Sequence, residues 1–234
     1  MSSPSRPTLS VQDLLAVIPA RSGSKRIPNK NLRSLGGKPL LLWTIEAAKE
    51  SCVFSSILVS TDSEVIAGVA RGAGLHVPFL RPSHLATDTA RMVDVIDHAV
   101  NWHEKSGREV AAVATLQPTS PLRTAEDIIA AFDCYNASPD RSVVSVSPAS
   151  PPPEFWVRLD GDAVVPLSGS WPRARSQDIP PVYALNGAIF ITPRAVLRAG
   201  DLVGERARPY VMPRERSVDI DDETDWRIVE ALVR

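Results

Sequence analysis

The chain has 234 residues, 44% of them hydrophobic and 23% charged, and its formal net charge is −1. This composition is typical of a globular protein with one substantial core, and it excludes a general nucleic-acid binder, which needs a basic surface. Cys52 and Cys134 stand far apart and form no C-x-x-C motif, so we expect reduced thiols and a cytoplasmic protein. The chain contains no apolar stretch as long as a membrane span, and its four histidines lack zinc-binding spacing.

The N-terminal residues are polar and lack the apolar segment of a signal peptide. We therefore expect a flexible N-terminal tail over residues 1–13 and a single domain over residues 14–234.

The first predicted strand is the apolar run Leu14–Pro19, which ends in a loop of small, basic and amide residues. Gly23 and two serines let the loop backbone come close to a ligand, and clustered cations beside backbone N–H groups suit a polyphosphate. The loop cations are Arg21, Lys25, Arg26 and Lys30. The Walker motif and the dinucleotide motif G-x-G-x-x-G are both missing, and an ordinary basic surface loop is the alternative.

The following elements alternate between strand and helix, which predicts an α/β fold with a mainly parallel sheet and helices on both faces. Ligands in such folds sit beyond the carboxyl ends of strands, where both the 21–31 loop and the 117–123 turn begin. We therefore expect these two segments to line one cleft. The expected helices cover 38–50, 62–74, 89–103, 125–135 and the end of 218–233, and the later strands cover 57–60, 110–116, 142–146 and 186–192.

Residues 148–181 interrupt this alternation with a proline-rich insertion. Within it, 154–159 and 163–167 can pair through the turn Asp160-Gly161-Asp162, so we expect a hairpin. Phe155, Trp156 and Trp171 are large aromatics of the kind found at interfaces. The alternative is that they pack back onto their own domain.

Acidic residues gather near the C-terminus, over 219–225. In an extended segment Asp219 and Asp221 point to the same face, where two carboxylates can hold one hard cation such as Mg²⁺. Helix capping explains Asp222 and Asp225 but gives no reason for Asp219.

Two further segments carry polar groups that suit a ligand. The turn 117–123 offers an amide, two hydroxyls and a guanidinium between stiffening prolines, although Thr124 also suits a helix cap. The segment 81–90 contains Asp88, for which capping of the following helix is the simpler interpretation.

Taken together, these motifs resemble the acylneuraminate cytidylyltransferases, the CMP-sialic acid synthetase family. The resemblance runs in order along nearly the whole chain. The motifs that carry it are Ile18–Lys25, Ser60-Thr61-Asp62, Arg81–Ala90, Gln117–Arg123, Asn186–Phe190 and Asp219-Ile220-Asp221.

The resemblance implies a nucleotidyltransferase fold, Rossmann-like and GT-A-like, in a homodimeric enzyme whose partners include neither membrane nor nucleic acid. The implied reaction activates a sialic-acid-like nonulosonic acid with CTP, releases pyrophosphate and uses Mg²⁺. The implied catalytic residues are Arg21, Lys25, Asp219 and Asp221, of which the two aspartates carry the metal. The implied nucleotide-binding residues are Ala20, Arg21, Ser22, Gly23, Ser24, Lys25, Asn31 and Arg81. The implied acceptor-binding residues are Gln117, Arg173, Arg175, Tyr183 and Asn186, and 148–181 is the implied dimerisation arm.

The chain also departs from the family pattern. Arg91 and Met92 stand where small hydroxyl residues are usual, and Ala184 and Leu185 stand where a basic residue is common. Arg26 and the run 175–178 are more similar to the pseudaminic and legionaminic members. The acceptor therefore stays open, with 3-deoxy-octulosonic acid or another small acidic sugar as alternatives. A non-catalytic nucleotide-sensing module is the alternative from another functional class.

Overall fold

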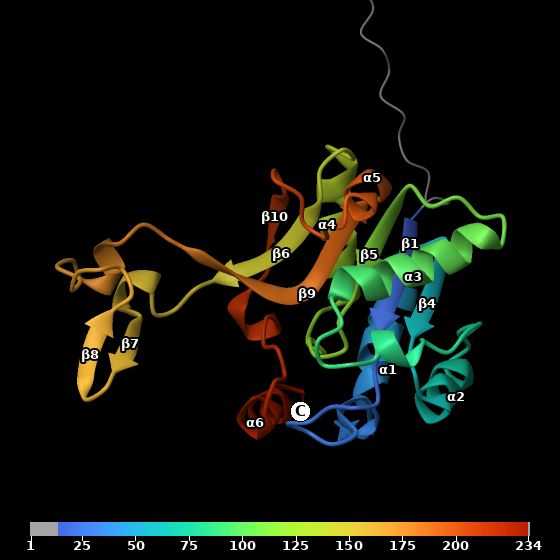
Figure 1. Cartoon of the computed structure of the whole chain (residues 1–234), viewed down its shortest axis with the longest axis horizontal. Coiled ribbons are helices and arrows are strands. Elements are labelled where there is room, and N and C mark those ends of the chain that lie inside the picture. Colours follow the sequence, from blue (N-terminus) through green and yellow to red (C-terminus); the bar gives the residue numbers. More distant parts are fainter. Residues whose placement is uncertain (1–13, 234) are drawn as a thin grey trace, which may run out of the picture.

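The computed structural model describes residues 14–233, so the expected tail over 1–13 lies outside the described residues. Within that range the main sheet has the strand order β10-β6-β9-β5-β1-β4 (Figure 1). Its strands are β1 (Leu14–Pro19), β4 (Ser56–Ser60), β5 (Ala112–Thr115), β6 (Val143–Pro148), β9 (Tyr183–Pro193) and β10 (Arg208–Val211). The α-helices are α1 (Leu40–Glu50), α2 (Glu64–Gly72), α3 (Met92–Lys105), α4 (Ala125–Asn136), α5 (Arg194–Arg198) and α6 (Glu223–Leu232).

The mainly parallel sheet predicted from the sequence is confirmed. Strand β1 pairs in parallel with β4 and β5, and β10 pairs in parallel with β6. Strand β9 is the exception, because it runs antiparallel to both β5 and β6. A parallel return requires a crossover, usually a helix, and the insertion after β6 supplies none, so the chain re-enters the sheet in the opposite direction.

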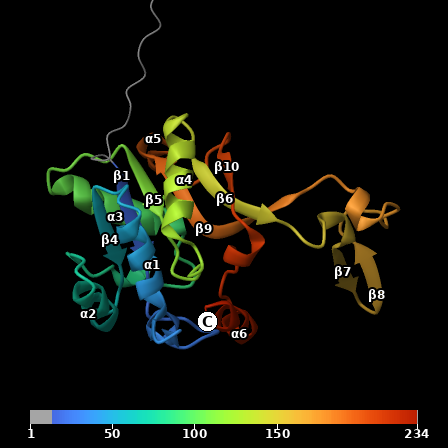
Figure 2. The ribbon, with the colours of Figure 1, turned by 180° about the vertical axis from the view of Figure 1, so that it is seen from behind.

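Helices cover both faces of the sheet (Figures 1 and 2). Alternate residues of β1 belong to two different cores, because successive strand side chains point to opposite faces. Leu14, Ala16 and Ile18 pack with α1, α2 and α4, whereas Leu15 and Val17 pack with α3 and α5. The sheet is therefore fully covered around β1, and this holds the loop that follows β1 on a rigid base.

Side-chain caps fix the starts of three helices. Ser63 caps α2, and Thr124 and Asp222 each complete a capping box with the aspartate three residues later. The capping roles expected of Thr124, Asp222 and Asp225 are therefore confirmed. The expected cap at Asp88 is wrong, because α3 begins only at Met92 with Arg91 before it, and Asp88 has other partners.

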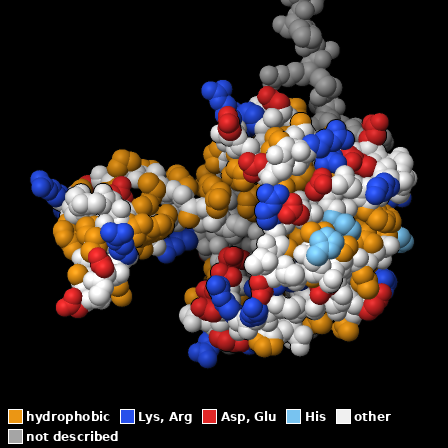
Figure 3. Space-filling view, viewed as in Figure 1, with side chains coloured by type: hydrophobic (Ala, Val, Ile, Leu, Met, Phe, Trp, Pro, Cys, Tyr) orange, Lys and Arg blue, Asp and Glu red, His pale blue; other side chains and the backbone are white. Residues whose placement is uncertain are grey.

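The insertion forms an arm that projects from the body of the molecule (Figures 1 and 2). Strands β7 (Val157–Asp160) and β8 (Ala163–Pro166) pair antiparallel within it, which confirms the expected hairpin. Apolar side chains cover much of the face of the arm seen in Figure 3. Its exposed large hydrophobics include Phe155, Trp156, Leu159, Leu167 and Trp171.

Cys52 and Cys134 are free thiols. No helix between residues 14 and 233 is long and apolar enough to cross a membrane.

A cluster of charges joins α3 to α5 on the sheet face away from α1. Arg194 is buried, and its guanidinium donates to Asp97 at 2.8 Å and to Glu104 at 2.9 Å. It also donates to the Asn101 side chain at 2.7 Å. These hydrogen bonds anchor a five-residue helix that is too short to be stable alone.

We expect Arg194→Gln to lower the free energy of unfolding by about 2 kcal/mol, because charge-assisted hydrogen bonds are lost while both carboxylates keep some contact with water. Urea denaturation measures this change. An unfolding midpoint equal to that of the wild type would contradict this role of Arg194.

Candidate functional site

A cleft of about 550 Å³ opens at the carboxyl ends of β1 and β5. The loop after β1 and the turn after β5 both contribute to its walls, as predicted for one shared cleft. Its lining includes five cations and two carboxylates among the described residues, so its charge suits an anion. These are Arg21, Lys25, Arg26, Lys30, Arg81, Asp88 and Asp221.

The loop after β1 is held in shape by one contact from outside it and by one within it. Ser22 donates to Asp62 from both its backbone nitrogen, at 2.9 Å, and its hydroxyl, at 2.6 Å. Asn31 donates from its side-chain amide to the Arg21 carbonyl at 2.9 Å. Burial acts to raise the pKa of Asp62, but the hydrogen bonds from Ser22 and the charge of Arg81 hold it below its usual value. The Asp62 carboxylate therefore stays ionised and fixes the loop.

Arg81 forms the buried back of the cleft beside the end of β4. Its guanidinium donates to the carbonyl and hydroxyl oxygens of Ser60, at 2.5 and 3.1 Å. Burial lowers the pKa of Arg81 to about 10, which leaves the group charged at neutral pH. The cleft therefore keeps a fixed positive charge at its base.

Asp88 lies between the two cations that the sequence assigns to phosphate binding. Its carboxylate is 2.6 Å from the Arg21 guanidinium and 2.5 Å from the Lys25 ammonium. Hydrogen bonds from Lys25 and Arg21 lower the pKa of Asp88. One internal carboxylate thus occupies both cations, and an incoming phosphate group would compete with it.

The acidic segment before α6 meets the basic loop at Lys30. The Lys30 ammonium donates to the Ile220 carbonyl at 2.6 Å, between the two aspartates in sequence. Burial lowers the pKa of Lys30, while the charges of Asp219 and Asp221 act in the opposite direction. Asp221 is also 3.2 Å from the Arg26 guanidinium. These contacts hold the basic loop after β1 against the acidic segment before α6.

The donor set of Asp219 and Asp221 fits a hard divalent cation. Asp219 Oδ1 is buried and has no hydrogen-bond partner, so it carries an unused oxygen ligand. Burial raises the pKa of Asp219, and the neighbouring charge of Asp221 adds to this effect against a hydrogen bond from Thr119. Over residues 14–233 no group of three or more His, Cys, Asp or Glu side chains could hold a metal, so the other ligands would be water and phosphate oxygens.

Gln117, which the resemblance implies contacts the acceptor, lines the cleft. Gly187 has φ +73°, and a Cβ atom there would lie 3.5 Å from Gln117 Nε2 and 3.9 Å from Asp219 Oδ2. Strand β9, the Gln117 turn and the acidic segment therefore converge at this glycine. A side chain at this point would be strained by the positive φ and would lie in van der Waals contact with both polar groups.

The structure gathers most of the predicted site residues but not all of them. Arg21, Ser24, Lys25, Asn31, Arg81, Gln117 and Asp221 line the cleft, and Ala20, Ser22 and Gly23 directly adjoin these residues in sequence. Asp219 does not line the cleft itself but lies two residues before Asp221. In contrast, Arg173 and Arg175 lie in the arm insertion and are exposed, and Arg175 pairs with Asp178. Tyr183 is exposed at the start of β9, where that strand leaves the arm.

Asn186 is buried, and its side chain is engaged within the protein. It accepts from Ser145 Oγ at 2.5 Å and donates to Ser217 Oγ at 3.0 Å. Its contact with an acceptor, implied by the resemblance, stays untested.

Three residues of the site were not assigned to it from the sequence. The sequence places Lys30 among the loop cations, Asp62 in one motif of the resemblance, and Asp88 in another such motif and at an expected helix cap. Asp62 could have been found, because it follows β4 at the edge where β1 also ends. The partners of Lys30 and Asp88 depend on how distant loops fold back, and local sequence carries no signal for this.

Comparisons with known proteins agree with this geometry. The profile of the family described as "Cytidylyltransferase" matches residues 15–154. The chain is 39% identical to CMP-N,N'-diacetyllegionaminic acid synthase of Legionella pneumophila, over 94% of this chain and 96% of that protein. It is 33% identical to post-translational flagellin modification protein B of Campylobacter coli, over 96% of each. It is 36% identical to N-acylneuraminate cytidylyltransferase of Escherichia coli, over 92% of this chain but only 51% of that longer protein.

Two solved structures share the fold at low sequence identity. A CMP:2-keto-3-deoxy-manno-octonic acid synthetase in complex with CTP aligns with TM-score 0.71 at 17% identity, over 94% of this chain and 98% of that one. A 4-diphosphocytidyl-2C-methyl-D-erythritol synthase from Anaerococcus prevotii aligns with TM-score 0.67 at 12% identity, over 95% and 98%. Both confirm the nucleotidyltransferase fold expected from the sequence. The profile match over more than half of the chain, and the two relatives that it matches along nearly their full lengths, show that the chain belongs to the cytidylyltransferase family of enzymes.

Proposed function

We propose that this enzyme transfers CMP from CTP to a nonulosonic acid of the sialic or legionaminic type, with Mg²⁺ as its metal. The observation that carries the proposal is the cleft in which the cationic loop and Asp221 share one lining, with the carboxylate of Asp219 near enough to interact with the charges of Asp221 and Lys30. The names of the relatives support a nine-carbon acidic sugar as acceptor, and the legionaminic enzyme matches along 96% of its own length.

The proposed chemistry is an in-line displacement. The anomeric hydroxyl oxygen of the acceptor attacks the α-phosphorus of CTP, the bond from that phosphorus to the β-phosphate bridging oxygen breaks, and the hydroxyl proton passes to water. Arg21 and Lys25 bind the phosphates and neutralise charge that grows on the leaving pyrophosphate. A divalent cation held by Asp219 and Asp221 would supply further positive charge to the phosphates. Positioning and electrostatics dominate, as in other phosphoryl transfers.

A pyrophosphate-release assay with CTP and a panel of acidic sugars tests this proposal. We expect release with CTP and a sialic or legionaminic acid, and weaker release with UTP, ATP or GTP. Preference for 3-deoxy-octulosonic acid would move the acceptor to the nearest alternative. Binding of CTP without pyrophosphate release for any acceptor would favour the nucleotide-sensing alternative. The pairing of Asp219 with Asp221 beside a cationic loop argues against that alternative, because a sensor needs no metal placed for transfer.

The first functional prediction concerns the metal. Asp219→Asn and Asp221→Asn should each lower turnover roughly 100-fold or more, because charge stabilisation of this kind is commonly worth that much. Asp225→Asn is the matched control, since this aspartate caps α6 and should mainly change stability, by about 1 kcal/mol. Steady-state kinetics over a Mg²⁺ titration measures these effects. Normal turnover of both variants at limiting Mg²⁺ would show that Asp219 and Asp221 do not bind the metal.

The second prediction concerns the cations that Asp88 occupies. Arg21→Ala and Lys25→Ala should weaken CTP binding by about tenfold or more, because each loses a charge-assisted hydrogen bond to phosphate. Asp88→Asn should instead tighten CTP binding, since the competing carboxylate is gone. Calorimetric titration with CTP measures both directions, with Arg71→Ala on α2 as a cationic control outside the cleft. If the Arg21, Lys25 and Asp88 variants all bind CTP with the affinity of the wild type, the loop does not hold the phosphates.

The third prediction concerns the arm, which we propose to be a dimerisation arm over residues 148–181. Exposed aromatics on a projecting hairpin are costly in water and suit a subunit interface. Arg173 and Arg175 would then complete the site of the partner subunit, where a carboxylated acceptor needs a cation. An Asp219→Ala subunit mixed with an Arg173→Ala/Arg175→Ala subunit should regain activity, because one cleft of the heterodimer has both halves intact.

Light scattering and kinetics of purified heterodimers check this arrangement. Each mutant homodimer is the control and should be inactive. A fully active monomer at micromolar concentration would refute the shared site, and so would heterodimers without any regained activity.

A further inference from the structure

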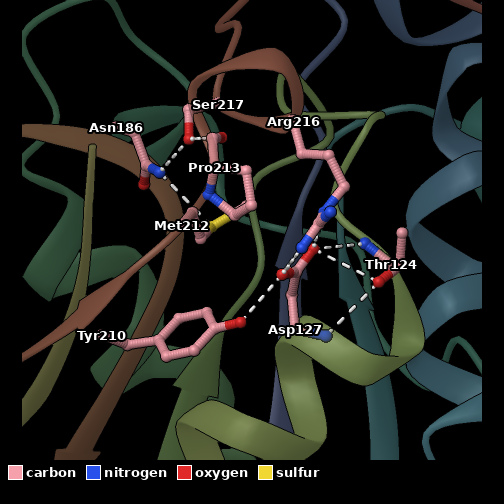
Figure 4. Close-up of polar contacts among 8 residues, drawn as sticks. All are labelled: Thr124, Asp127, Asn186, Tyr210, Met212, Pro213, Arg216 and Ser217. Atoms are coloured by element: carbon pink, nitrogen blue, oxygen red, sulfur yellow. Dashed lines mark hydrogen bonds and ion pairs between the residues drawn. The ribbon is translucent and has the colours of Figure 1, made fainter. Parts of the chain in front are cut away.

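The segment that leads into the acidic pair is tied to α4 by one ion pair (Figure 4). Arg216 donates from Nε to Asp127 Oδ2 at 2.9 Å and from Nη2 to Oδ1 at 2.8 Å, so the contact is bidentate. The Asp127 side chain has no exposed surface, whereas 36% of the Arg216 side chain is exposed. A planar fork of this kind fixes orientation as well as distance.

The same carboxylate also fixes the beginning of α4. Asp127 accepts from the backbone nitrogen of Thr124 at 3.0 Å, and this completes the helix cap. It accepts a further hydrogen bond from Tyr210 on β10 at 2.8 Å. Because α4 follows directly after the turn that carries Gln117, Asp127 joins the acceptor side of the site to the strand before the acidic pair.

Ser217, the next residue after Arg216, is held from a third element. Its hydroxyl accepts from Asn186 of β9 at 3.0 Å and donates to the Pro213 carbonyl at 2.8 Å (Figure 4). Beyond Asp219, the backbone nitrogen of Ile220 donates to the Thr119 carbonyl at 2.8 Å. Asp219 therefore lies in a short span fixed on both sides, at Arg216–Ser217 and at Ile220.

The charge of Asp127 makes this anchor depend on Arg216. Burial acts to raise the pKa of Asp127, but hydrogen bonds from Arg216, Thr124 and Tyr210 hold it below its usual value. The carboxylate is thus ionised and fully enclosed. Without the guanidinium of Arg216, the enclosed carboxylate would lose its bidentate partner and keep only the charge of the buried Arg123, with which it forms no direct ion pair. The segment after β10 would then lose its fixed orientation.

We propose that Asp127 and Arg216 are positioning residues that aim the Asp219 carboxylate at the metal, and this inference rests on the proposed function. Asp219 comes three residues after Arg216, and its buried Oδ1 has no hydrogen-bond partner to orient it. Thr119 donates a hydrogen bond to this carboxylate, so its direction depends on Thr119 and on the backbone of the span 216–220. The Asp127–Arg216 ion pair fixes the position of this backbone relative to Gln117. The pair therefore has a role in the site in addition to its contribution to stability.

The test measures metal binding directly and not only activity. Mn²⁺ is titrated into the full-length enzyme with CTP and without acceptor, and binding is followed by the water-proton relaxation rate. We expect Arg216→Gln to weaken Mn²⁺ binding about 3–10-fold, whereas its affinity for CTP in EDTA stays within twofold of the wild type. Arg216→Lys keeps the charge but not the fork and should fall between. The activation constant for Mg²⁺ should rise in the same order.

Arg194→Gln is the matched control, because Arg194 is another guanidinium held in a bidentate contact by a carboxylate, that of Glu104, but it lies on the far pair α3 and α5. It should lower the melting temperature and leave Mn²⁺ binding unchanged. If Arg216→Gln, like the control, lowers the melting temperature but leaves Mn²⁺ binding unchanged, the pair is purely structural and the inference is wrong. If Arg216→Gln does not fold, Arg216→Lys decides in the same way.

Asp219→Asn separates the inference from the proposed function. We expect it to weaken Mn²⁺ binding more than tenfold. If Asp219→Asn binds Mn²⁺ as the wild type does, the metal assignment fails, and the positioning inference fails with it. If Asp219→Asn loses the metal but both Arg216 variants bind it normally, the inference alone is overturned.

Discussion

Five cationic side chains share one cleft, and their mutual repulsion is the constraint on which the rest of the site depends. Like charges in a partly enclosed space destabilise the fold unless carboxylates lie among them. Asp88 pairs with two of the cations, Asp221 lies beside a third, and the charge of Asp62 acts on Arg81. The enzyme therefore carries its own anions where a triphosphate is proposed to bind. Binding is then an exchange of one set of anions for another.

A second constraint is that the acidic segment must stay rigid although it has little regular structure of its own. Between β10 and α6 the chain forms only a short 3-10 turn, Arg214–Arg216. Side chains from α4 and β9 and the backbone of the Gln117 turn supply the missing order. The buried side chains of Ile220 and Trp226 then pack α6 against the basic loop through Ile27. The two halves of the cleft are therefore parts of one packed unit.

Much of the fold could be predicted from the sequence, because local chemistry determines it. The capping residues Thr124 and Asp222, the turn at Gly161 and the apolar run of β1 each act over a few positions. The direction of β9 could not be predicted, since strand periodicity is the same in either direction. The partner of Asp88 could not either, because an exposed acid before a helix suits a cap as well as an ion pair.

The candidate site likewise has a part that local sequence predicts and a part that depends on contacts between distant residues. The cations and the acidic pair are visible as residue types at fixed spacing, whereas Asp127 and Asn186 bind Arg216 and Ser217 through contacts between residues distant in sequence. Asp127 was visible only as a residue inside an expected helix. Its bond to Arg216 spans 89 positions, and no periodicity encodes such a contact.

The arm shows how the sheet and the proposed interface are physically linked. Strands β6 and β9 continue their pairing out of the sheet, as far as Pro148 with Tyr183, and Leu185 in this ribbon is 62% exposed. An isolated two-stranded ribbon is at best marginally stable in water, and the hairpin β7–β8 at its end is also two-stranded. Packing against a second subunit would stabilise both two-stranded ribbons. Because β9 also carries Asn186 and Gly187, an ordered ribbon would in turn steady the strand against which Gln117 and Asp219 lie.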